Sequence, residues 1–122
     1  MDLLIRFTQQ ITEHADLAEL RSRGFNGFDS LEGTDRPRFN SYMHAVFRTV
    51  EGMYYQHLQG HSDPRVWRGI EAVIRDINAF PGVQTWWRLR SHWFDEEFVK
   101  FINQQQQTAK PPRLYREPMK DE

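Results

Sequence analysis

The chain has 122 residues, a formal net charge of -1 and no cysteine. This length indicates a single domain, and the balanced charge excludes a strongly basic nucleic-acid-binding or membrane-surface protein, although it is compatible with a local patch. The absence of cysteine excludes disulfide scaffolds, cysteine zinc sites, iron–sulfur clusters and thiol nucleophiles.

Apolar residues recur every three or four positions, which predicts an all-α fold. A first helix is expected over about 2–14. Asp16 is expected to cap a short second helix, with Glu19 completing a capping box and Gly24 ending the helix. The segment 25–30 is typical of a loop, and we expect its two phenylalanines to fold back onto the core.

The longest helix is predicted over about 35–59, because an apolar stripe continues through it until Gly60. The pair Asp63-Pro64 is a strong helix start, and Pro81-Gly82 ends the helix that follows. That helix carries an apolar stripe that we expect to be core, made of Val66, Trp67, Ile70, Val73, Ile74 and Ile77.

A further helix follows, with the adjacent residues Trp86 and Trp87, whose side chains project about 100° apart and are expected to lie in different environments. Asp95 is expected to open the last helix, and the apolar pattern ends at Gln104. We therefore predict a compact bundle of five to six mostly antiparallel helices, with one helical domain over 1–106 and a disordered tail over 107–122.

Aromatic residues make up 14% of the chain, and arginine outnumbers lysine. Rings and arginines together are enriched at protein interfaces, so the first hypothesis is a non-enzymatic interaction or self-association module. We expect Trp87, Arg88 and Arg90 to form its surface and a protein partner or a second copy to bind there.

A second hypothesis is an arginine-rich surface that binds nucleic acid or another anionic ligand through Arg65, Arg68, Arg88 and Arg90. Nucleic acid is the less favoured ligand, because the sequence contains no recognised nucleic-acid-binding motif.

A third hypothesis is a small ligand-binding bundle or enzyme, with a pocket between helices lined by rings and by Glu51, His57 or His92. We assign no catalytic residue, because the pair formed by His92 and Asp95 is more typical of a helix cap beside a packed histidine. His57 and His61 have the spacing of two metal ligands, but Gly60 interrupts the helix between them and no third ligand is near. We therefore expect no metal and no cofactor.

One ordered set of motifs resembles a group of small bacterial helical proteins for which no activity is known. The resemblance covers about 3–103 and is carried by Asp16-Leu17-Ala18-Glu19-Leu20, Arg23-Gly24, Phe39, Tyr54-Tyr55-Gln56, Val66-Trp67, Pro81-Gly82, Trp86-Trp87 and Phe94-x-x-x-Phe98. It implies an all-helical domain and, in many members, an N-terminal membrane helix. No run in this chain reaches the ~20 apolar residues of a membrane span. We therefore expect a cytoplasmic protein or the cytoplasmic part of a membrane-tethered parent.

Overall fold

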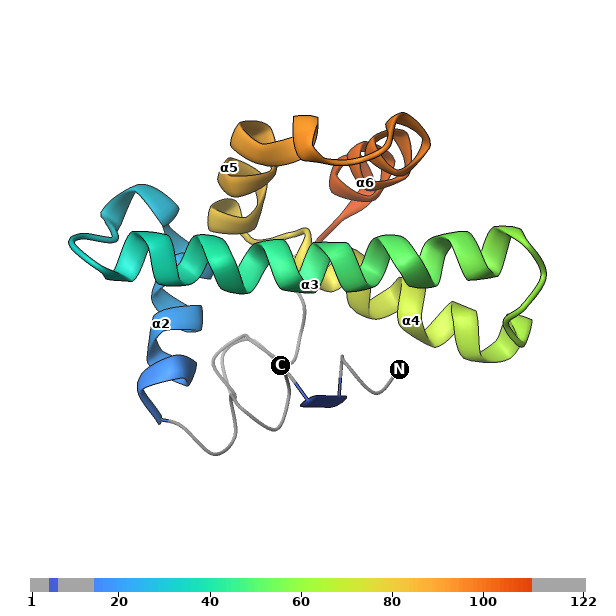
Figure 1. The fold of residues 1–122 in the computed structure, drawn as a ribbon, viewed down its shortest axis with the longest axis horizontal. Coiled ribbons are helices and arrows are strands. Elements are labelled where there is room, and N and C mark those ends of the chain that lie inside the picture. Colours follow the sequence, from blue (N-terminus) through green and yellow to red (C-terminus); the bar gives the residue numbers. More distant parts are fainter. Residues whose placement is uncertain (1–4, 7–14, 111–122) are drawn as a thin grey trace.

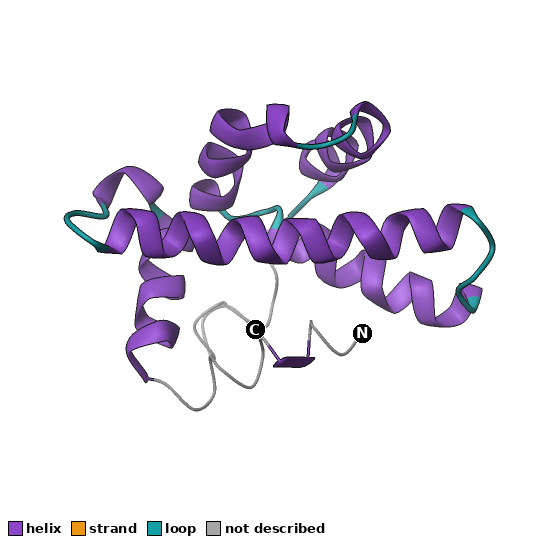
Figure 2. Cartoon of the chain, viewed as in Figure 1, coloured by secondary structure: helices purple, strands orange, loops and turns teal. Residues whose placement is uncertain are grey.

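The computed structural model describes residues 5–6 and 15–110, and within them it contains helices and connecting turns but no strand (Figures 1 and 2). This part of the chain confirms the predicted all-α bundle. Apart from residues 5–6, which are helical, the helix expected over 2–14 lies outside the described residues, as does the tail beyond 110. The helices are α2 (Ala15–Asn26), α3 (Asp35–Leu58), α4 (Pro64–Ile77), α5 (Pro81–Arg90) and α6 (Glu96–Thr108), with 3-10 turns η1 (Phe28–Ser30) and η2 (Ser91–Trp93).

The long helix α3 is the axis of the fold, and the other helices lie around it. Figure 1 shows α4 returning along one side of α3, while α5 and α6 lie on the other side. Helix α2 packs against α3 and α5 near the start of α3, and α6 also contacts α4. The core between these helices is rich in rings, and its most buried members are Phe39, Met43, Val83, Trp86, Phe98 and Ile102.

Local signals set the ends of three helices as the sequence predicts. The Asp63 carboxylate accepts a hydrogen bond from the backbone N–H of Arg65 at 2.8 Å, and so caps α4. Asp95 caps α6 in the same way through the N–H of Glu97 at 3.0 Å. Gly60 has a φ of 77°, which glycine adopts without strain, and it ends the turn after α3.

The predicted end of the second helix at Gly24 is wrong, because α2 continues to Asn26. Gly24 instead permits close packing: a Cβ at this position would lie 2.6 Å from Cζ of Phe39. Gly82 faces it from α5, and a Cβ there would lie 2.8 Å from the carbonyl oxygen of Phe25. Asp16 lies in the first turn of α2 rather than before it, and its carboxylate accepts a hydrogen bond from Arg38 of α3.

The two adjacent tryptophans are both buried, contrary to the expectation of different environments. Their rings stack on the same side chain, with centroids 5.4 Å (Trp86) and 5.0 Å (Trp87) from that of Phe47. Each indole N–H also has a hydrogen-bond acceptor, Asn40 of α3 for Trp86 and Asn103 of α6 for Trp87. Because Trp86 reaches α3 and Trp87 reaches α6, both directions lead into the core.

The last helix does not end with its apolar pattern at Gln104, because α6 continues to Thr108. Two glutamines hold this end against α4: Gln105 is buried and donates a hydrogen bond to Glu71 at 3.4 Å, and Gln106 donates to Asn78 at 2.7 Å. The side chains are polar, so a search for apolar periodicity does not detect the last turn. The tail predicted from 107 onward therefore begins inside α6.

Candidate functional site

The candidate functional site is an apolar groove between α3 and α4, which encloses about 360 Å³. Its α3 wall consists of Val46, Phe47, Val50 and Met53. The opposite wall consists of residues of α4 and of Asn78 just after it: Val66, Gly69, Ile70, Val73, Ile74, Ile77 and Asn78. Almost no polar group faces the groove, which suits an apolar side chain or helix face better than a polar ligand.

Helix α4 is held in the fold by only part of its apolar stripe. Trp67 and Ile74, two turns apart, are 5% and 4% exposed and pack into the core. Val66 and Val73, also two turns apart, are 53% and 51% exposed. The stripe is wider than the surface that α3 and α6 cover, so the two valines are left at the open edge of the groove. Large exposed apolar side chains in one line mark interaction surfaces more often than isolated ones do.

The three residues predicted to form an interaction surface on α5 lie in different surroundings. Trp87 is 2% exposed and belongs to the core. Arg88 is exposed and donates a hydrogen bond to Thr85. Arg90 is half-buried, donates to Asn40 at 3.0 Å and lies 5.0 Å above the ring of Trp93. The Arg90 side chain thus covers the ring of Trp93 and holds the amide oxygen of Asn40, which also accepts from Trp86.

The four arginines of the anionic-ligand hypothesis are not brought together. Arg65 and Arg68 lie on α4, whereas Arg88 and Arg90 lie on α5, on the opposite side of α3 in Figure 1. Arg65 forms an ion pair with Asp63 at 3.4 Å. The structure therefore offers no single surface that contains all four.

The histidines have separate surroundings. The ring of His57 stacks on Trp67, with centroids 4.4 Å apart and planes 8° apart, and His61 is exposed beyond the end of α3. Among the described residues, no group of three or more histidine, aspartate or glutamate side chains is arranged to hold a metal ion. His92 is exposed, and its ring lies 6.0 Å from that of Trp93.

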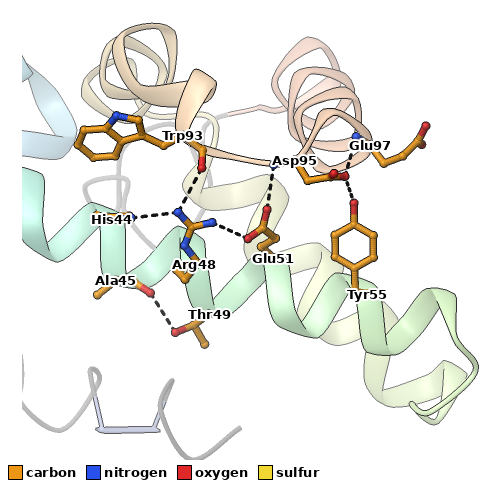
Figure 3. Close-up of polar contacts among 9 residues, drawn as sticks. All are labelled: His44, Ala45, Arg48, Thr49, Glu51, Tyr55, Trp93, Asp95 and Glu97. Carbon is orange, nitrogen blue, oxygen red and sulfur yellow. Dashed lines mark hydrogen bonds and ion pairs between the residues drawn. The ribbon is translucent and has the colours of Figure 1, made fainter.

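A polar cluster connects α3 with the start of α6 (Figure 3). The guanidinium of Arg48 forms an ion pair with Glu51 at 2.7 Å, donates to the carbonyl of Trp93 at 3.2 Å and lies 4.5 Å above the ring of Phe94. The second carboxylate oxygen of Glu51 accepts from the N–H of Asp95 at 3.1 Å. Glu51 is thus partnered by Arg48, one turn before it on α3. The cluster fixes the backbone before α6.

The Tyr55 hydroxyl donates a hydrogen bond to the Asp95 carboxylate in the same cluster. This hydrogen bond, together with burial, raises the pKa of Tyr55 to about 12. The same hydrogen bond lowers the pKa of Asp95, and the hydrogen bond from the backbone N–H of Glu97 lowers it further. Each group is therefore held in the protonation state it has at neutral pH, and the cluster is a structural clamp with its donors and acceptors paired to one another.

No family model, curated protein or solved structure matches the chain. The bacterial group suggested by the sequence motifs therefore stays an expectation. In residues 5–6 and 15–110, no helix is long and apolar enough to cross a bilayer.

The apolar pattern of the sequence does not predict the groove, because it places the whole α4 stripe in the core. One signal could have revealed it. The stripe contains two pairs with the same seven-residue spacing, Trp67 with Ile74 and Val66 with Val73, on adjacent lines of one helix. A single neighbouring helix covers only one such line well, so the second line is available for another partner.

Proposed function

We propose that this protein is a non-enzymatic helical interaction module whose binding surface is the groove between α3 and α4. The observation that carries the proposal is the exposure of Val66 and Val73, at 53% and 51%, beside an almost wholly apolar groove. Such a groove accepts the apolar face of a helix through anchors spaced by three or four residues. The proposal keeps the interaction function suggested by composition but moves its surface from α5 to α4.

The geometry gives less support to the other two hypotheses. An anionic ligand would require the arginines to converge, and they lie on two helices on opposite sides of α3. An enzyme pocket lined by Glu51, His57 or His92 would require these groups to share a cavity. Glu51 is instead bonded within the clamp, and His57 is stacked on Trp67.

Binding of the dye 1-anilinonaphthalene-8-sulfonate tests whether the groove binds apolar groups. Val73→Glu places a charge at its edge and should remove most of the fluorescence enhancement without unfolding the chain, because residue 73 is half exposed. Leu89→Glu is the matched control, since Leu89 is 45% exposed on α5, on the other side of α3. Equal dye binding by the wild type and both variants would contradict the proposal.

A further inference from the structure

The exposed side of α4 carries one line of residues that is complementary to itself. Val66, Gly69 and Val73 follow one another at intervals of about one turn along this side. Arg65 and Asp76 flank the two ends of this line, and because they are about three turns apart they point in the same direction as each other. When a second α4 is placed antiparallel against the first, valine meets valine and arginine meets aspartate.

The two charges at the ends of this line are accessible. The Arg65 side chain is 82% exposed, and its ion pair is with its near neighbour Asp63 at 3.4 Å. Asp76 is exposed as well, and within the described part of the chain its carboxylate has no ion pair. Both groups can therefore bind a partner without breaking a contact between helices.

The centre of the line is free of side-chain bulk. Gly69 is exposed, and a Cβ placed there would meet nothing within 4 Å. Packing within this chain therefore does not require glycine at this position, unlike at Gly24 and Gly82. A glycine midway between two exposed valines lets a second helix backbone approach closely.

We propose that a second copy of this chain covers the groove, with the two α4 helices antiparallel about a two-fold axis near Gly69. This inference rests on the proposed interaction function and names its partner. Val66 of each copy packs against Val73 of the other, and Arg65 pairs with Asp76 of the second copy. Because of the two-fold symmetry, each of these contacts occurs twice in the dimer. One pair of helices of 14 residues is a small interface, so we expect a dissociation constant on the order of micromolar.

Sedimentation equilibrium of the full chain across concentration tests this dimer. Arg65→Asp or Asp76→Arg alone opposes like charges twice and should raise the dissociation constant about tenfold. The double variant, Arg65→Asp with Asp76→Arg, restores the attraction and should return close to the wild-type value. These changes place an acid near the start of α4 and a base near its end, which suits the helix dipole, so the fold should be retained. Arg88→Asp on α5 is the charge-reversal control and should change nothing.

The outcomes separate this inference from the proposed function. A dimer that weakens in the single variants and recovers in the double variant supports the antiparallel α4 pair. A chain that stays monomeric at millimolar concentration, or a dimer that charge reversal leaves unchanged, overturns it. If the monomer still binds the dye at the groove, the interaction function stands and the partner is a different protein. If the monomer does not bind the dye, both proposals fail.

Discussion

The crossing of α2 and α5 depends on the absence of a side chain at Gly82, and Gly82→Ala is the substitution that tests it. A Cβ at this position would lie 2.8 Å from the carbonyl oxygen of Phe25, and closer still to that of Gly24. Real Cβ atoms essentially never approach within 3.0 Å of another heavy atom. The obstructing atoms belong to the backbone, so the two helices have to move apart to admit the methyl group.

The expected cost combines two opposing effects. Overpacking of this kind costs about 1–3 kcal/mol, and the rigid backbone neighbours place this site at the upper end. Alanine recovers up to about 1 kcal/mol of helix propensity over glycine. We therefore expect Gly82→Ala to reduce the free energy of unfolding by about 2 kcal/mol, and to lower the melting temperature by roughly 8 °C.

Urea unfolding followed by circular dichroism measures this loss, with Gly52→Ala as the matched control. Gly52 lies inside α3, and a Cβ there would meet nothing within 4 Å. The control should therefore gain about 0.5–1 kcal/mol from helix propensity alone. If Gly82→Ala were as stable as the wild type, the close crossing of α2 and α5 would not exist as described.

Three further substitutions give distinct results. Asp95→Asn should reduce the loss of stability in acid. Because the fold lowers the pKa of Asp95, the carboxylate stabilises the protein above its unfolded-state pKa, and this stabilisation disappears as the pH falls through the folded-state pKa. Urea titrations of both proteins at pH 7 and pH 3 would show the difference. Tyr55→Phe should remove the corresponding loss of stability in alkali. Because the fold raises the pKa of Tyr55 to about 12, the hydroxyl stabilises the protein fully below about pH 10, and this stabilisation is lost as the pH rises through 12. Unfolding measured between pH 9 and 12 would reveal the difference. Phe47→Ala should cost about 3–5 kcal/mol, because its ring stacks on both Trp86 and Trp87, and near-ultraviolet circular dichroism should report the loosened indoles.

Features that depend on residues close together in the chain could be predicted from the sequence. The caps at Asp63 and Asp95 and the turn at Gly60 depend on the backbone within one or two residues, so their signals are local. The pairing of Glu51 with Arg48, one turn away on α3, is local in the same sense.

Features that depend on helices meeting in space could not be predicted. Glycine is typical of helix ends, but Gly24 is needed for close packing against Phe39 of α3 and Gly82 of α5. Trp87 is of a type common at interfaces, but α6 covers it and accepts its indole hydrogen bond through Asn103. The groove also depends on how the helices meet. The apolar stripe of α4 is evident in the sequence, but the sequence does not show which residues of this stripe the other helices leave exposed.

Disulfide trapping tests the central claim, that two copies meet along α4, most directly. The chain has no cysteine, so Gly69→Cys introduces a single thiol beside the proposed two-fold axis. A disulfide requires the two Cα atoms to lie within about 4.4–6.8 Å, and the proposed pair should bring them this close because Gly69 has no side chain to hold the helices apart. We expect Gly69→Cys to form a covalent dimer rapidly under mild oxidation, on a non-reducing gel, while Leu89→Cys on α5 stays monomeric. Cross-linking that is equal at both positions, or absent at residue 69, would contradict the account.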